Sequence, residues 1–237
     1  MDEQMNRLVD KAWNTFLETP ENKRLLIAIG GIPGSGKTTL SKCLTVALNA
    51  RHASLFPDRP AIAAFVPMDG YHYTRAQLDA MPDPVTAHAR RGAAFTFDGE
   101  GFLRLVQQLR EPLTDETTTI FAPSFDHAIK DPKENDIPVE RTHRIVVLEG
   151  NYTLLSIAPW SHAASLFHLK IFITADPSIA RTRLAARHLA AGLASTPAEA
   201  DRRAIENDLP NGEEIIRLRI PDVDVVIESL EDDSWLT

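Results

Sequence analysis

A glycine-rich turn between an apolar run and a helical pattern constrains this chain more than any other feature. The run Leu25–Ile29 is wholly aliphatic, and G-x-x-x-x-G-K-T over 31–38 follows it, succeeded by helical spacing over Lys37–Asn49. Glycines let a backbone wrap a phosphate with its N–H groups turned inward, and the start of a helix adds a favourable dipole. Lys37 can then reach the β- and γ-phosphates of a nucleotide, and the Thr38 hydroxyl is a suitable Mg²⁺ ligand. The pattern predicts a nucleoside triphosphate site, against the alternative of a glycine-rich turn with a lone lysine. The predicted binding residues are Gly31, Ile32, Pro33, Gly34, Ser35, Gly36, Lys37, Thr38 and Thr39.

The rest of the chain alternates short apolar runs with helical patterns, which favours a parallel sheet covered on both faces. We therefore expect an α/β fold of three layers, with a mainly parallel sheet of five or slightly more strands and a small helical lid, in one domain over 1–237. The expected strands are Leu25–Ile29, Ala61–Val66, Thr119–Phe121, Ile145–Leu148, Leu169–Ile173 and Val223–Ile227, and the expected helices are Lys37–Asn49, Phe102–Arg110, Pro177–Ala191 and Pro197–Asn207.

Residues 1–20 carry apolar side chains at helical spacing, from Met5 to Leu17. We interpret them as an amphipathic helix packed on the domain, with membrane or partner binding as the alternative. The segment 69–98 is irregular and rich in Pro, His, Tyr and Arg, which favours a long functional loop. Residues 130–141 are expected to form a plain surface loop. Cys43 falls on the apolar face of the helix after the glycine turn and is expected in the core.

Composition excludes several classes of protein. With 25 Lys and Arg against 33 Asp and Glu, the formal net charge is −8, unlike a dedicated duplex-binding protein. The single cysteine excludes an intramolecular disulfide and fits a reducing compartment. Because no signal peptide or long apolar run is evident, we expect a cytoplasmic protein that does not bind a membrane. The acidic charge balance predicts that it does not bind nucleic acid, and we expect a monomer or homodimer.

Two acids close apolar runs, at Asp69 and Glu149, and each is followed by a glycine that leaves space for a ligand. Parallel strands end at the same edge of a sheet, so both carboxylates should lie beside the phosphate site. Acids there can hold Mg²⁺ and orient an acceptor for phosphoryl transfer, although an ordinary strand-end acid is the alternative for each. Asp176 also follows an apolar run, but Asp before Pro is more typical of a helix N-cap.

Several motifs in order resemble one kinase group. After the glycine turn come Met-Asp-Gly-Tyr-His at 68–72, Leu-Glu-Gly-Asn-Tyr at 148–152 and Thr-Arg-Leu-Ala-Ala-Arg-His at 182–188. They resemble the uridine kinase, phosphoribulokinase and pantothenate kinase group of P-loop small-molecule kinases, over about Leu25 to Glu228. The segments 90–98 and 207–211 resemble a subgroup of these kinases.

The resemblance implies roles for individual residues. Asp69 matches the catalytic base, which also touches the Mg²⁺ shell, and Glu149 matches a metal-holding glutamate beside Thr38. Arg183 and Arg187 match lid arginines that clamp the transferring group with Lys37, in a lid region over 181–205. The chain continues from this motif without the usual further arginines; Arg202 or Arg203 could substitute, or be solvated helix surface.

The residues expected to contact the acceptor are polar or aromatic and lie in or near matching segments. For each, an exposed loop residue or a structural hydrogen bond is the alternative. These candidates are His72, Tyr73, Arg75, Arg90, Arg91, Asp98, Phe125 and His127.

The motifs predict an ATP- and Mg²⁺-dependent kinase that phosphorylates a hydroxyl of a small metabolite of the nucleoside, sugar or pantothenate kind. A regulatory NTPase without a small-molecule acceptor is the main alternative. A silent nucleotide-binding module is a third, disfavoured by the intact set Lys37, Thr38, Asp69 and Glu149.

Overall fold

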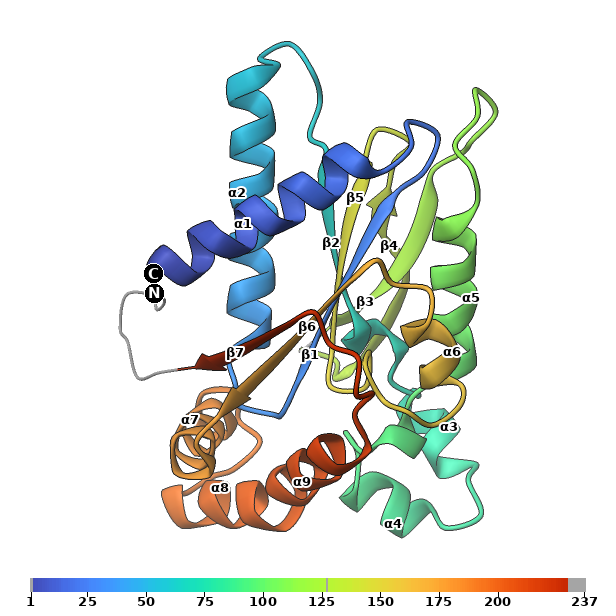
Figure 1. The fold of residues 1–237 in the computed structure, drawn as a ribbon. Helices are drawn as coiled ribbons and strands as arrows, with labels where there is room; N and C mark the ends of the chain where they lie inside the picture. The colour runs from blue at the N-terminus through green and yellow to red at the C-terminus, as the bar shows by residue number, and fades with distance from the viewer. Residues whose placement is uncertain (1, 127, 230–237) are drawn as a thin grey trace.

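A five-stranded parallel sheet organises the fold of the computed structural model, which describes residues 2–126 and 128–229 (Figure 1). In the order β2-β5-β1-β6-β7, every neighbouring pair is parallel, as the sequence predicted. The central strands are buried on both faces, which explains their unbroken apolar runs. The strand bounds are β1 Leu25–Gly31, β2 Ala63–Pro67, β5 Ile145–Glu149, β6 Leu169–Ala175 and β7 Val225–Ser229.

Helices α1 (Asp2–Glu18) and α2 (Lys37–Leu55) cover one face of the sheet (Figure 1). Alternate residues of the strands point toward them and form one apolar cluster, in which Trp13 of α1 and Leu44 of α2 are buried. The N-terminal stretch thus forms the expected helix, although Leu17 is two-thirds exposed. The prediction of a core position for Cys43 is wrong: its side chain is exposed, because it lies on the side of α2 that faces away from the sheet.

The opposite face is covered by α5 (Gly99–Arg110) and α6 (Trp160–Ala164). Phe102 of α5 is fully buried, and its ring lies 5.4 Å from that of Tyr71 and 5.7 Å from that of Trp160. The helices on the two faces and the sheet between them make the three layers that the sequence predicted.

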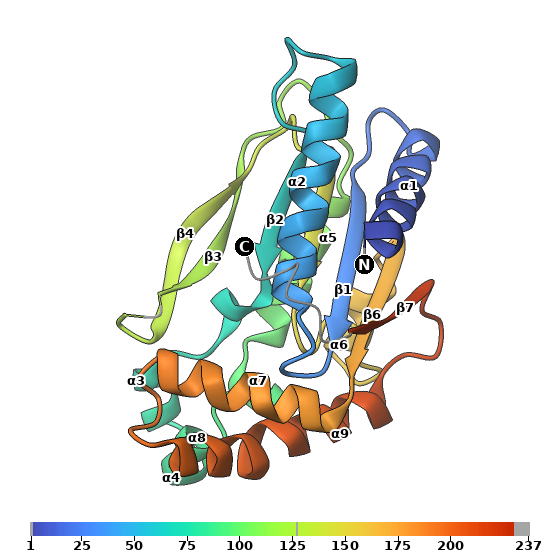
Figure 2. The ribbon, with the colours of Figure 1, turned by 90° about the vertical axis from the view of Figure 1, so that its left-hand side faces the viewer.

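A two-stranded antiparallel hairpin, β3 (Ile120–Asp126) and β4 (Asp131–Val139), stands apart from the main sheet (Figure 2). The strand expected at Thr119–Phe121 is present as the start of β3, although it pairs within this hairpin and not with the main sheet. The surface loop expected at 130–141 is wrong, because most of that segment is β4. The sequence obscures β4, because only Val139 is fully buried and two prolines interrupt the run. Proline is tolerated on such strands because each has a free edge.

The carboxyl ends of the strands are roofed by short helices, in the lower part of Figure 1. The segment 69–98, predicted as a loop, contains η1 (Met68–Tyr71), α3 (Arg75–Asp79), α4 (Pro84–Ala89) and η2 (Ala94–Thr96). Residues 181–205, predicted to form a lid, fall mostly in α7 (Pro177–Ala190) and α8 (Pro197–Arg203). The predicted end of the last helix at Asn207 is wrong, because a π-helical turn, η3 (Ala204–Asp208), continues α8 into α9 (Leu209–Leu218).

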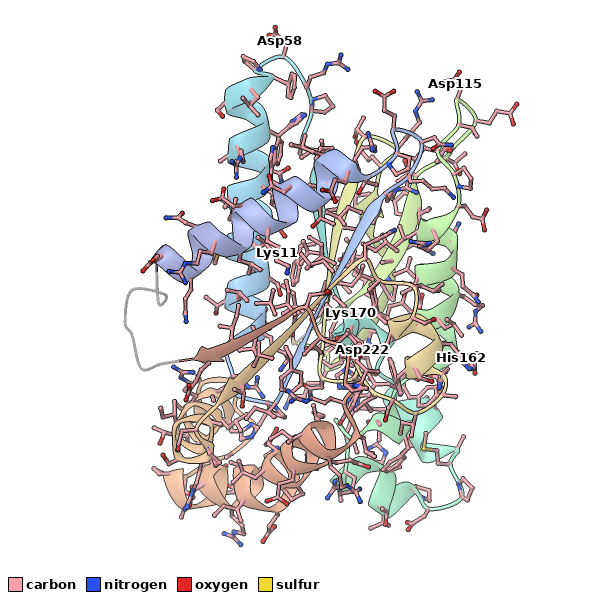
Figure 3. All side chains as sticks on the ribbon, viewed as in Figure 1. Lys11, Asp58, Asp115, His162, Lys170 and Asp222 are labelled. Carbon is pink, nitrogen blue, oxygen red and sulfur yellow. The ribbon has the colours of Figure 1, made fainter. Side chains whose placement is uncertain are left out.

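Side chains fill the space between the layers, and the labelled Asp58 and Asp115 mark the end of the molecule opposite the lid helices (Figure 3). Among the described residues, no helix combines the length and apolar character needed to cross a membrane.

Candidate active site

The glycine turn joins β1 to α2 in a backbone conformation that only glycine adopts readily. Gly34 and Gly36 have φ of 78° and 84°, in the left-handed region. A Cβ at Gly34 would also lie 2.7 Å from the carbonyl oxygen of Ala180 on α7, so this glycine lets the lid region approach the loop. Within the loop the Ser35 hydroxyl is buried and has no hydrogen-bond partner among the described residues. An unpartnered polar atom there fits a loop built to meet a polar ligand.

Lys37 begins α2 and folds back over its own loop. Its Nζ donates a hydrogen bond of 2.9 Å to the carbonyl oxygen of Ile32, and the residue is only 6% exposed. Burial is the main cause that lowers the pKa of Lys37 to about 8; the charge of Glu149 opposes this shift, as does that of Asp69, and the charge of Arg187 adds to it. The ammonium group therefore lies within electrostatic reach of both predicted acids.

Glu149 closes β5 next to the glycine turn, because it pairs in register with Ile29 of β1 and Pro67 of β2. Its carboxylate is buried and accepts a hydrogen bond of 3.2 Å from the Thr38 hydroxyl. Burial is the main cause that raises the pKa of Glu149 to about 7; the charge of Lys37 opposes this shift and the charge of Asp69 adds to it. Two predicted Mg²⁺ ligands are thus in direct contact.

Asp69 lies two residues beyond β2, in the turn η1, and its side chain is exposed. The glycines after the two acids serve protein packing rather than leaving space for a ligand. A Cβ at Gly70 would lie 2.1 Å from the carbonyl oxygen of Pro123 in β3, and one at Gly150 would lie 2.4 Å from the Cβ of Met68. These close approaches fix η1 between β5 and the hairpin, and so set the position of Asp69.

The two predicted lid arginines lie on α7 and differ in how far their side chains are exposed to solvent. Arg183 is half-buried and donates to the Ser229 hydroxyl at 2.9 Å and to the Gly34 carbonyl at 3.4 Å. Arg187 is exposed, and its charge acts on both Lys37 and Glu149. The structure therefore brings both predicted arginines to the loop.

Asp208 is a residue of this region that sequence reasoning missed. Its carboxylate lies 2.8 Å from His188 Nε2 and 3.9 Å from the Arg187 guanidinium, so it ties α7 to η3. The segment 207–211 was noted only as part of a resemblance, and nothing in its spacing points to an ion pair with α7.

The site fits a magnesium-bound triphosphate. Mg²⁺ takes hard oxygen ligands, usually one or two carboxylates together with substrate phosphates. Thr38, Glu149 and Asp69 supply such oxygens beside a phosphate-binding loop, with Lys37 and Arg187 to balance the charge of the phosphates. In the described part of the chain, no group of three or more His, Cys, Asp or Glu side chains forms a metal site of protein ligands alone.

The residues predicted to contact an acceptor lie around η1 and the hairpin, and several hold protein structure. The His72 ring lies 3.9 Å from that of Phe97 and 4.9 Å from that of Phe125. Asp98 caps α5 by accepting from the Gly101 N–H at 2.8 Å. A cavity of about 290 Å³ between η1, α5 and the hairpin is lined by His72, Tyr73 and Asp98 together with Gly70, the neighbour of Asp69.

Arg91 is largely occupied by protein partners. Its guanidinium donates to the Tyr73 carbonyl at 2.9 Å, to the Lys130 carbonyl at 2.6 Å and to Asp131 at 2.8 Å. This arginine pins the segment after α4 to the hairpin. His127 lies outside the described residues.

Comparisons with known proteins place this arrangement in a family, although no family model matches the chain. It is 53% identical to the ATP-dependent kinase-like protein notR' of Aspergillus versicolor over 154 residues, which make up 65% of this chain and 90% of that protein. It is 43% identical over 203 residues to "Putative uridine kinase C227.14" of Schizosaccharomyces pombe, covering 85% of this chain and 83% of that one. The chain belongs to the ATP-dependent P-loop kinases. The resemblance stated from the motifs is thereby confirmed.

Solved structures agree with this assignment. YFH7 from Saccharomyces cerevisiae superposes with a TM-score of 0.84 and 25% identity, covering 96% of this chain and 99% of that one. A "putative fructose transport system kinase" from Silicibacter sp. superposes with a TM-score of 0.77 and 31% identity, covering 94% of this P-loop kinase and 98% of that chain. The names of these relatives differ in the acceptor they suggest.

Proposed function

We propose that this P-loop kinase transfers the γ-phosphoryl group of ATP to a hydroxyl of a small metabolite of the nucleoside, sugar or pantothenate kind. The observation that carries the proposal is the convergence of Lys37, Glu149, Asp69 and Arg187 at the ends of β1, β5 and β2, close enough for their charges to act on one another. This set has a cation for the phosphates, oxygens for Mg²⁺ and a solvent-accessible carboxylate.

Each residue then has a task in the reaction. The loop 31–39 holds the phosphates, and Thr38 and Glu149, with Asp69, would hold Mg²⁺, which neutralises charge on the β- and γ-phosphates when bound. Asp69 accepts the proton of the acceptor hydroxyl while that oxygen bonds to the γ-phosphorus and the bond to the bridging oxygen of ADP breaks. Lys37, Arg183 and Arg187 stabilise the charge on the transferring group.

Lys37 must leave its loop carbonyl to perform this task. In the structure its Nζ hydrogen-bonds to Ile32, and a triphosphate in the loop offers stronger, charged acceptors. The low pKa of Lys37 rises when phosphates surround it, because a nearby negative charge favours the protonated form. Nucleotide binding is therefore expected to take up protons at Lys37 near pH 8.

The test is ADP release with and without a panel of uridine, fructose and pantothenate, with Asp69→Asn as the variant. The proposal is supported if one acceptor stimulates ADP release and Asp69→Asn lowers the stimulated rate by about a hundredfold. The affinity of the variant for ATP should stay within about threefold of wild type. The matched control is Asp79→Asn, at the exposed end of α3. Fast ADP release that no acceptor stimulates would instead favour a regulatory NTPase, and wild-type turnover of Asp69→Asn would remove the base.

A further inference from the structure

A cleft of about 510 Å³ lies between the end of α4 and the lid helix α8 with its continuation η3. Its volume lies in the usual range for small-molecule sites. It is separate from the glycine turn, and Arg90, Arg202 and Arg203 are the residues singled out from the sequence that line it. The charged and amide side chains that line it are Arg90, Arg202, Arg203, Glu199, Glu206 and Asn207.

Three arginines meet in this cleft without carboxylate partners. In the part of the chain that the structure describes, Arg90, Arg202 and Arg203 form no ion pair within 4.0 Å. Arg90 donates to the side-chain oxygen of Asn211 at 2.6 Å, a neutral acceptor that leaves its charge uncompensated.

The two glutamates of the cleft do not offset these charges equally. Glu199 accepts from the Ser195 N–H at 2.8 Å, which directs its carboxylate toward the loop before α8. Glu206 is exposed on η3. Three positive and two negative groups leave the cleft with an excess of positive charge.

Two buried polar atoms of the cleft residues have no partner among the described residues, the Nε of Arg203 and the Oδ1 of Asn207. Asn207 is 8% exposed, and its Nδ2 donates to the carbonyl of Arg91, so its free atom is an acceptor. A buried acceptor and a buried donor without partners are costly unless a ligand or water satisfies them. Together they call for a ligand that brings both an anionic oxygen and an N–H or O–H.

We propose that this cleft binds an anionic group, phosphate or carboxylate, of the phosphoryl acceptor, so that the acceptor of this P-loop kinase is an anionic metabolite. The inference rests on the proposed function and adds to it the charge class of the acceptor. Guanidinium groups suit phosphate and carboxylate oxygens because they can donate two parallel hydrogen bonds.

The position of the cleft supports an acceptor rather than an unrelated anion. On one side of the cleft, Asn207 precedes Asp208, which contacts Arg187 of the catalytic group. On the other side, Arg90 contacts Asn211. The next residue, Gly212, lies against Ile32 of the glycine turn. A molecule held here is contacted by the segment after η1 and by the lid region at once. Its binding would therefore hold the lid close to the phosphates, as acceptor-dependent kinases require.

The first experiment compares acceptors in pairs that differ by one anionic group: uridine with uridine 5′-monophosphate, fructose with fructose 1-phosphate, and panthenol with pantothenate. We expect kcat/KM to favour an anionic member by roughly tenfold or more. Arg203→Gln should remove that preference and leave the KM for ATP within about twofold. Arg217→Gln, an exposed arginine of α9, is the matched control and should behave as wild type.

A preference for the neutral member, or an Arg203→Gln variant altered only in its KM for ATP, overturns the anion site while the proposed kinase activity stands. If no acceptor stimulates ADP release, the proposed function fails, and a binding measurement then decides on the cleft. Inorganic phosphate is titrated calorimetrically into protein saturated with Mg·ADP. Binding weakened roughly tenfold by Arg203→Gln supports the site; no binding, or binding that the variant leaves unchanged, overturns it.

Arg202→Gln provides a second variant in case Arg203→Gln does not fold, because Arg202 is exposed. Loss of this more solvated charge should weaken phosphate binding by roughly threefold. Phosphate affinity equal to that of Arg217→Gln would count against the cleft.

Discussion

Without ligand, the Glu149→Gln variant should be more stable than the wild type, and this difference in the free energy of unfolding should grow as the pH rises. The substitution has this effect although it removes a group proposed for catalysis. Burial raises the pKa of Glu149 from its ordinary 4.5 to about 7. Between these values the unfolded chain has lost the proton and the folded chain keeps it, so the free energy of unfolding of the wild type falls as the pH increases. Glutamine cannot ionise, and the variant escapes this loss.

The magnitude follows from the pKa. A difference of one pH unit corresponds to about 1.4 kcal/mol, so a rise from 4.5 to about 7 amounts to about 3 kcal/mol once the carboxyl is ionised in both states. Part of this loss develops below pH 5. The variant should therefore gain about 2 to 3 kcal/mol over the wild type between pH 5 and pH 8.

The assay is urea unfolding without nucleotide or Mg²⁺, followed by tryptophan fluorescence, since Trp13 and Trp160 are buried in the two apolar clusters. Glu116→Gln is the control, because Glu116 is exposed and follows Asp115 at the end of the molecule opposite the lid (Figure 3). The reasoning is refuted if the stability difference between Glu149→Gln and the wild type is the same at both pH values, or moves in the opposite direction.

Three further substitutions test other parts of the structure. Lys37→Ala should weaken ATP binding by roughly tenfold or more in calorimetry, since a charge-assisted contact to phosphate is lost; unchanged affinity would place the lysine outside the site. Gly70→Ala puts a Cβ 2.1 Å from the carbonyl oxygen of Pro123, so turnover should fall while ATP affinity stays near wild type, and normal turnover would show that η1 can shift freely. Phe102→Ala removes a fully buried ring and should lower the free energy of unfolding by about 3 to 5 kcal/mol in urea titration, and a loss below about 1 kcal/mol would contradict its core position.

The sheet and the phosphate loop could be predicted from sequence because their signals are local. Leu25–Ile29 has no polar residue, and a parallel strand with both faces covered needs none. Glu149 could be placed beside the loop because parallel strands end at one edge, and its register with Ile29 confirms that expectation. The assignment of catalytic roles to Asp69, Arg183 and Arg187 stays a prediction.

The remainder depends on contacts between segments that lie far apart in the chain. Strand β4 shows no apolar alternation because it is a largely exposed strand. Its strand conformation therefore could not be inferred from its own residues. Cys43 follows helical spacing that is correct for α2, but the sheet meets a neighbouring stripe of that helix. The helix expected to end at Asn207 continues instead, because Pro210 occupies the first turn of α9, where proline needs no N–H partner.

The hairpin described above contributes no strand to the parallel sheet, and it meets η1 through the carbonyl of Pro123. Changes in the tip between β3 and β4 can therefore accumulate without disturbing the register of the five central strands. The tip of the hairpin is thus separate from the five-stranded sheet, whereas its base, with Ile120, Ala122 and Val139, packs into the apolar core. Kinases that share one phosphate site but differ in their acceptors could therefore arise by changes confined to the tip of the hairpin.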